Sequence, residues 1–206
     1  MVHYKLTYLN GRGLAECARQ LFALADQQYE DVRLSREEFA SIKSNMPFGQ
    51  VPVLEIDGEE LAESQAINRY LARTFGFAGK TPIEEAIVDS LGDQFSEYRG
   101  QIKPYLFVLF GFASGDLDKL KKEALPARDK FFGILTKFLQ KNSDSGFLVG
   151  KSLTWIDLLV AEHVSDINTR VPDYFDGFPE VKAHMEKVRS DLKLKKWISS
   201  RPQSTF

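Results

Sequence analysis

The chain contains a single cysteine, Cys17, among its 206 residues. One cysteine cannot form an internal disulfide, nor can it supply the set of thiolates that holds a structural zinc ion. The sequence also lacks a Cys-x-x-Cys pair, which excludes the redox chemistry that depends on that motif. A reducing compartment is therefore compatible with the sequence, and we interpret Cys17 as a packed side chain.

Long apolar runs and an excess of one charge are also absent. The most apolar stretch, 105–113, falls short of the ~20 residues of a membrane-spanning helix. The N-terminus lacks the apolar core of a secretory signal. A net charge of -2 gives no bulk attraction to nucleic acid or anionic membranes, and the three histidines show no metal-ligand spacing. We therefore expect a cytoplasmic protein without metal, nucleic-acid or membrane partners.

The first part of the chain alternates between strand and helix patterns. Its predicted order is a strand at 3–8, a helix starting at Leu14, a strand at 29–34, a short helix over 35–44, a hairpin over 53–61 and a helix from Ser64. Asp57-Gly58 favours the tight turn of that hairpin. The opening strand–helix–strand predicts a parallel strand pair with a right-handed crossover.

No strand pattern follows the linker at 76–82, which contains two glycines and a proline. Helical periodicity is predicted over 83–110, 118–141, 154–167 and 178–199. Thr154 and Asp157 have the spacing of a helix capping box. We therefore predict an α/β domain over 1–77 and an all-α domain over 83–206.

Val51-Pro52 lies in a loop just before a predicted strand. Proline tolerates a cis peptide bond at a cost of about 0.5–1 kcal/mol. A cis bond here would aim the N–H and C=O of Val51 outward, where they could pair with an extended peptide. The alternative is an ordinary trans proline opening an edge strand, and trans is the commoner state.

Two further features could take part in binding or catalysis. Glu63-Ser64 precede a predicted helix, whose N-terminal N–H groups and partial positive charge suit a carboxylate. Ser64 is also predicted to cap that helix, and both roles can coexist. Tyr8 ends the first predicted strand, and its hydroxyl could donate to a thiolate, which lowers the pKa of a thiol. The alternative is a core tyrosine bonded to the backbone.

The order of these features resembles that in the cytosolic glutathione transferases. The stretches that carry the resemblance are Tyr4–Tyr8, Arg12–Glu16, Pro47–Pro52, Glu63–Ile67, Gly150–Asp157, Trp197–Ile198 and Arg201–Pro202. The resemblance spans the whole chain and is strongest to the sigma class, which includes haematopoietic prostaglandin D synthase, and to its nematode members. It implies a thioredoxin-like glutathione-binding domain followed by an all-helical domain.

The resemblance assigns roles in glutathione binding. Tyr8 would stabilise the glutathione thiolate, and the backbone of Val51, before a cis-proline at Pro52, would pair with the cysteinyl part. Glu63 and Ser64 would hold the γ-glutamyl group. The residues expected at the glycyl end are Phe39, Lys43 and Gln50.

The second substrate and the oligomeric state also follow from the resemblance. It implies a homodimer in which Asp93 reaches the glutathione of the partner subunit. The residues expected around the electrophile are Leu9, Gly13, Leu14, Tyr105 and Phe206. Three departures from the family pattern suggest weaker or altered glutathione binding. This chain has Leu14 where the family often has arginine, Glu63 where it usually has glutamine, and Phe39 where it commonly has tryptophan.

We therefore expect a glutathione transferase that conjugates the thiolate to small apolar electrophiles, a detoxification reaction. Three alternatives stay open. The fold could carry haem or other large apolar anions (a ligandin role), it could isomerise a substrate as prostaglandin D synthases do, or it could be purely structural. The retained Tyr8 and Ser64 speak against the last alternative. The sequence does not fix the physiological electrophile.

Overall fold

The computed structural model describes residues 2–204. The chain divides into two compact units, each described separately below. The first unit joins the residues up to Ala78 with those from Arg189 onward, and the second unit spans Gly79–Val188. The predicted all-helical domain ran to residue 206, whereas the structure groups its C-terminal segment with the first unit.

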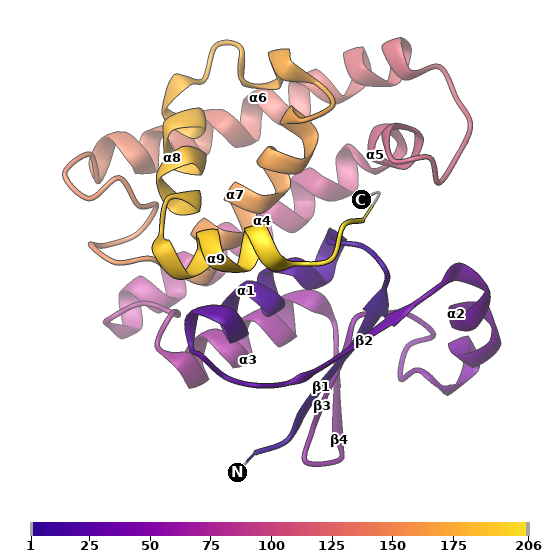
Figure 1. The fold of residues 1–206 in the computed structure, drawn as a ribbon. Helices are drawn as coiled ribbons and strands as arrows, with labels where there is room; N and C mark the ends of the chain where they lie inside the picture. Colours follow the sequence, from indigo (N-terminus) through magenta and orange to yellow (C-terminus); the bar gives the residue numbers. More distant parts are fainter. Residues whose placement is uncertain (1, 205–206) are drawn as a thin grey trace. The chain divides into compact units, whose positions relative to one another are not determined.

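A four-stranded sheet forms the centre of the first unit, in the order β2-β1-β3-β4 (Figure 1). Its strands are β1 (Tyr4–Leu9), β2 (Glu30–Leu34), β3 (Val53–Ile56) and β4 (Glu59–Ala62). β1 and β2 are parallel, whereas β3 is antiparallel to both β1 and β4. Asp57 and Gly58 have φ values of 49° and 95°, as a primed hairpin turn requires. The predicted parallel pair and hairpin are thus confirmed.

Helices α1 (Glu16–Leu24) and α3 (Ser64–Phe75) lie side by side on the sheet, and α2 (Arg36–Ile42) contacts β2 (Figure 1). Leu6, Leu54 and Leu71, from two strands and α3, have no exposed surface. These side chains form a core between the sheet and the helix layer. The last helix, α9 (Leu192–Ser200), packs on α1 and buries Leu194.

The second unit is helical. Its helices are α4 (Pro82–Gln101), α5 (Lys103–Leu109), α6 (Leu117–Lys141), α7 (Trp155–Asn168) and α8 (Pro179–Arg189). The stretch 83–110 is helical as predicted, but it is divided into α4 and α5 because Pro104 lacks the N–H that would continue α4. The predicted helical stretch 178–199 is likewise divided, into α8 and α9. Asp191 starts a new helix there by accepting the backbone N–H groups of Lys193 and Leu194.

Trp155 is the largest fully buried side chain of the second unit. It packs where α4 and α7 meet. A methyl group added at Gly92 of α4 would lie 2.3 Å from the Trp155 ring. Glycine at position 92 therefore lets the indole lie directly against the backbone of α4.

The Asp157 carboxylate organises the start of α7. It accepts the backbone N–H and the hydroxyl of Thr154 at 2.8 and 2.7 Å, which confirms the predicted capping box. Its other oxygen accepts the Leu148 N–H at 2.8 Å and lies 2.8 Å from His184 Nε2. Asp157 is fully buried, so these contacts replace the water that an exposed carboxylate would bind.

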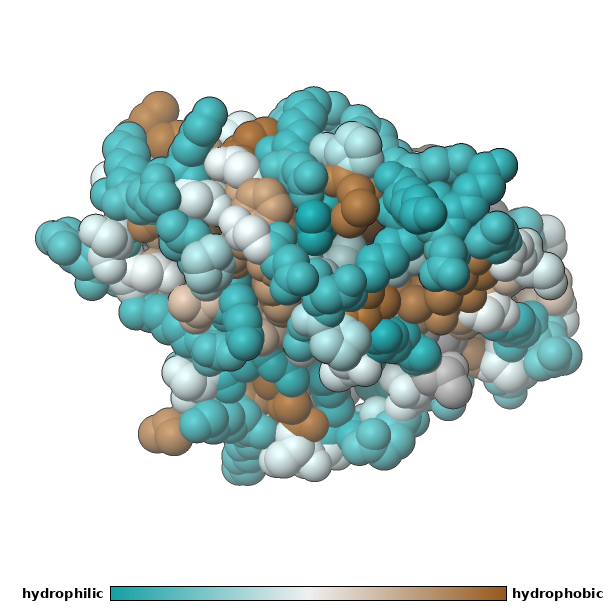
Figure 2. Space-filling model, turned by 90° about the horizontal axis from the view of Figure 1, so that it is seen from above, coloured by the Kyte–Doolittle hydropathy of each residue, from teal (hydrophilic) through white to brown (hydrophobic). Residues whose placement is uncertain are grey.

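The face drawn in Figure 2 is mostly hydrophilic, and its hydrophobic residues gather in separate patches. No helix within residues 2–204 is both long and apolar enough to cross a membrane.

Candidate active site

On one side of the sheet β1 and β4 end and β3 begins, and predicted site residues lie close to these points. Thr7 of β1 lies opposite Val53 of β3, which lies opposite Ala62 of β4. The adjacent residues in the same direction across the sheet are Tyr8 after Thr7, Pro52 before Val53 and Glu63 after Ala62. The strand register therefore brings together positions that are far apart in the sequence.

A groove lies at this end of the sheet. Its lining residues are Leu14, Phe48, Gln50, Val51, Pro52, Ala62, Glu63 and Ser64. Five of the predicted binding residues thus share one groove with Leu14, which was predicted for the neighbouring pocket. The Val51–Pro52 peptide bond is cis.

Tyr8 is 7% exposed, and its hydroxyl oxygen accepts the Leu14 N–H at 3.2 Å. Because the oxygen accepts this bond, the phenolic proton is available for donation to another group. Gly13, with φ of +40°, brings the turn so close that a methyl group on it would lie 2.5 Å from the Tyr8 oxygen. The turn before α1 therefore fixes the position of the Tyr8 hydroxyl.

The start of α3 differs from its prediction. Glu63, not Ser64, is the N-cap residue, and its side chain makes no capping hydrogen bond. Glu63 has a φ of 71°, which is rare for a residue other than glycine. The prediction that Ser64 caps the helix was therefore wrong. The N-terminal end of α3, with its partial positive charge, opens on the groove that Glu63 and Ser64 line.

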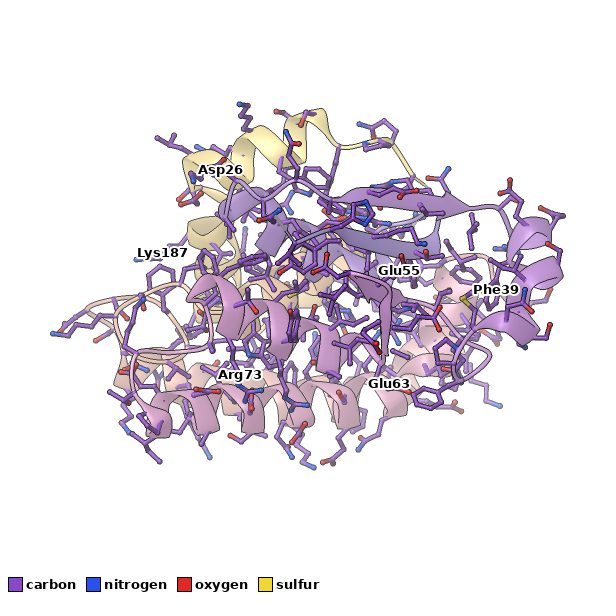
Figure 3. The ribbon with its side chains drawn as sticks, turned by 90° about the horizontal axis from the view of Figure 1, so that it is seen from below. Asp26, Phe39, Glu55, Glu63, Arg73 and Lys187 are labelled. Atoms are coloured by element: carbon purple, nitrogen blue, oxygen red, sulfur yellow. The ribbon has the colours of Figure 1, made fainter. Side chains whose placement is uncertain are left out.

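Phe39 and Lys43 lie outside the groove lining. Phe39 is half-buried on α2, and Lys43 is exposed in a short 3₁₀ helix that follows α2. Figure 3 labels Phe39 on α2 and Glu63 beside the first turn of α3. Phe48 was missed by the sequence reasoning, although it lines the groove with 65% of its surface exposed. Phe48 lies in a loop between Pro47 and Pro52, and this position could have predicted that its side chain is exposed.

The remaining predicted residues divide between the two units. Leu9 ends β1 and is half-buried in the first unit. Asp93, on α4, is exposed, and Tyr105, on α5, is buried, and both belong to the second unit. Phe206 lies outside the described residues. Within residues 2–204, no group of three or more His, Cys, Asp or Glu side chains is placed to hold a metal ion.

Comparisons with known proteins agree along the whole chain. The N-terminal domain of glutathione S-transferases matches residues 4–73, and the C-terminal domain matches residues 109–201. Probable glutathione S-transferase 5 of Caenorhabditis elegans is 52% identical over 100% of both chains. The chain belongs to the glutathione S-transferase family. The sequence resemblance and the expected fold are thereby confirmed.

Two solved structures extend the comparison. Na-GST-3, a glutathione S-transferase of the hookworm Necator americanus described as monomeric, is 58% identical with a TM-score of 0.94, and the alignment covers 99% of this chain and 100% of that chain. A prostaglandin D synthase of Nilaparvata lugens is 33% identical with a TM-score of 0.87, over 98% and 100% of the two chains. Proteins of this fold therefore include one described as a prostaglandin synthase and one described as a monomeric glutathione S-transferase.

Proposed function

We propose that this glutathione S-transferase binds glutathione in the groove beside Val51 and that Tyr8 donates a hydrogen bond to its thiolate. The strand register, which brings Tyr8 of β1, Pro52 before β3 and Glu63 after β4 into one row, carries the proposal. An extended cysteinyl backbone would pair with the N–H and C=O of Val51. Its sulfur would then lie on the Tyr8 side of the row.

The two ends of glutathione would bind to different groups of the protein. The γ-glutamyl carboxylate would bind at the N-terminus of α3 beside Ser64, where the helix dipole and N–H groups favour an anion. The exposed Glu63 carboxylate would attract the ammonium group of the same residue. At the glycyl end, Lys43 supplies a positive charge for the second carboxylate, with Gln50 and Phe39 as neighbours.

Conjugation follows when the thiolate attacks an apolar electrophile held beside it. A free thiol is mostly protonated at neutral pH, so a donated hydrogen bond that favours the thiolate raises the concentration of the nucleophile. The electrophile would lie over Leu9, Gly13 and Leu14, and the family resemblance adds Tyr105 and Phe206 as candidates. Leu14 makes the near wall of that site apolar.

Steady-state conjugation of glutathione to an aryl halide tests this function. Tyr8→Phe should lower kcat/KM at least tenfold, which is roughly 1.4 kcal/mol of transition-state stabilisation. Tyr4→Phe, which removes a buried hydroxyl at the other end of β1, is the matched control and should retain activity. An inactive wild type, or equal loss in both variants, would contradict the thiolate mechanism.

The structural likeness to an insect prostaglandin D synthase favours isomerisation as a second candidate. This reaction would use the same thiolate without consuming glutathione. Incubation with prostaglandin H2 and measurement of both product and remaining glutathione distinguish it from conjugation. Haem titration, with conjugation assayed in parallel, tests the carrier role: a tight haem complex of an inactive protein would favour it.

We further propose a cytoplasmic homodimer in which Asp93 contributes to the partner's glutathione site. The related Na-GST-3 is described as monomeric, so the assembly requires direct measurement. Sedimentation equilibrium should give twice the chain mass. Asp93→Asn should then weaken glutathione binding, whereas a monomer insensitive to that change would refute this assignment.

A further inference from the structure

A buried arginine on α1 lies directly behind Tyr8. Arg19 has no exposed surface, and its guanidinium carbon lies 5.9 Å from the centre of the Tyr8 ring. Its Nη1 donates to the Gly11 carbonyl at 2.6 Å, and its Nε donates to Asp31 at 3.0 Å. Gly11 belongs to the same turn as Leu14, whose N–H holds the Tyr8 oxygen. Arg19 therefore fixes both the ring and the turn that positions the hydroxyl.

Glu16 connects this arginine to the C-terminal segment of the same unit. Its carboxylate is fully buried, and one oxygen lies 3.5 Å from Arg19 Nη1. The other oxygen accepts the indole N–H of Trp197 and an N–H of Arg201, both at 2.7 Å. A continuous set of contacts thus runs from the end of α9 through Glu16 and Arg19 to the turn at Tyr8.

Several charged side chains are paired around Arg19. The members of this cluster are the carboxylates of Glu16 and Asp31 and the guanidinium groups of Arg19, Arg33 and Arg201. Tyr29 lies nearby, and burial raises the pKa of its phenol, so this group stays neutral at physiological pH. The Arg19 guanidinium has no exposed surface and lies behind the Tyr8 ring, so its positive charge, screened little by water, would favour a thiolate at the Tyr8 hydroxyl.

We propose that Trp197 and Arg201 are positioning residues for thiolate formation, which act on Tyr8 through Glu16 and Arg19. The inference rests on the function proposed above and adds a requirement to it. Activation of glutathione depends on how the C-terminal helix is anchored to the first turn of α1. Trp197 and Arg201 are not among the residues that line the groove, so their effect is expected on thiolate formation rather than on substrate contacts.

The chain offers a matched control on the same helix. Lys193 of α9 donates to the Leu24 carbonyl at 3.0 Å and pairs with Asp26, so it anchors α9 to the C-terminal end of α1. Lys193→Met therefore loosens the same helix pair at the end remote from the Tyr8 turn. A merely structural role of the α9 contact predicts similar consequences for both anchors.

The test is the pH dependence of kcat/KM for glutathione conjugation in Trp197→Phe, Arg201→Gln and Lys193→Met. In the first two variants we expect the apparent thiol pKa to rise by about 0.5–1 unit, which lowers kcat/KM about three- to tenfold below that pKa. Arg201→Lys keeps a donor and a charge and should restore part of the loss. Lys193→Met should keep the pH profile of the wild type. In a Tyr8→Phe background, Trp197→Phe should no longer shift the profile.

Two results would overturn the inference: unchanged pH profiles in both Trp197→Phe and Arg201→Gln, or an equal shift in Lys193→Met. If Arg201→Gln fails to fold, Trp197→Phe carries the test, because it removes one indole N–H and leaves the Arg201 contact to Glu16 in place. Wild-type inactivity would refute the proposed function and this inference together. Wild-type activity that depends on Tyr8 but not on Trp197 would refute this inference alone.

Discussion

Replacing Gly13 by alanine should show whether activity depends on the position of the Tyr8 hydroxyl, independently of the stability of the fold. The new methyl group would lie 2.5 Å from the Tyr8 oxygen, where an ordinary contact needs about 3.5 Å. The hydroxyl or the turn must therefore move by about 1 Å. A displacement of that size at a reacting group can lower the rate about 100-fold. We expect this loss in kcat/KM for Gly13→Ala.

Gly76→Ala is the control for backbone strain. Gly76 has a φ of +83° at the end of α3, and nothing lies within 4 Å of the position that its methyl group would take. Both variants place alanine in the left-handed region, which costs about 1–2 kcal/mol. Urea denaturation should thus show comparable losses of stability, whereas only Gly13→Ala should lose most of its activity.

A double-mutant cycle makes the reasoning on Gly13 refutable. In Tyr8→Phe the atom that the methyl group would overlap is gone, and the next ring atom would lie 3.1 Å away. Adding Gly13→Ala to Tyr8→Phe should therefore cost little further activity. If Gly13→Ala is as active as Gly76→Ala, or if its effect is undiminished beside Tyr8→Phe, the hydroxyl is not the group that the turn positions.

Three further predictions concern stability, pH and binding. Asp157→Ala removes a buried acceptor of several hydrogen bonds and should lower the free energy of unfolding by about 3–5 kcal/mol in urea, whereas the exposed Asp144→Ala should change it by less than about 0.5 kcal/mol. Burial lowers the pKa of His163 to about 3. Below about pH 6.5 the unfolded chain therefore binds a proton that the native chain excludes, and stability should fall by up to about 1.4 kcal/mol per pH unit towards pH 3. Urea curves at several pH values should show a shallower fall in His163→Gln. By calorimetry, Glu63→Gln should weaken glutathione binding by up to about fivefold without weakening an analogue that lacks the α-ammonium group, and equal effects on both ligands would contradict the pairing.

Local patterns sufficed for much of the first unit. Asp57-Gly58 predicted the hairpin because few dipeptides adopt two successive positive φ values, and the hairpin in turn aligned Ala62 with Val53. The parallel pairing of β1 and β2 followed from the helix between them. Together these elements place Tyr8 beside Val51-Pro52, so most of the groove was predictable before its geometry was known.

Other features depended on contacts that periodicity does not contain. Pro104 lies within an uninterrupted apolar pattern, yet its missing N–H ends α4. Glu63 is the N-cap residue of α3 and has a positive φ, which a glutamate side chain does not favour. The buried Glu16 is a polar residue on an amphipathic helix, and two of the partners that explain its burial, Trp197 and Arg201, lie about 180 residues later in the sequence.

The grouping of α9 with the first unit has a consequence for synthesis of the chain. The segment up to Ala78 leaves a growing chain long before α9 is made, and until then the face of α1 that contacts α9 has no cover. A fragment that ends at residue 78 would expose the Glu16 carboxylate and lose its two partners from the C-terminal segment. The first unit is therefore complete only when translation has reached the last residues that form it, after the whole helical unit has been made.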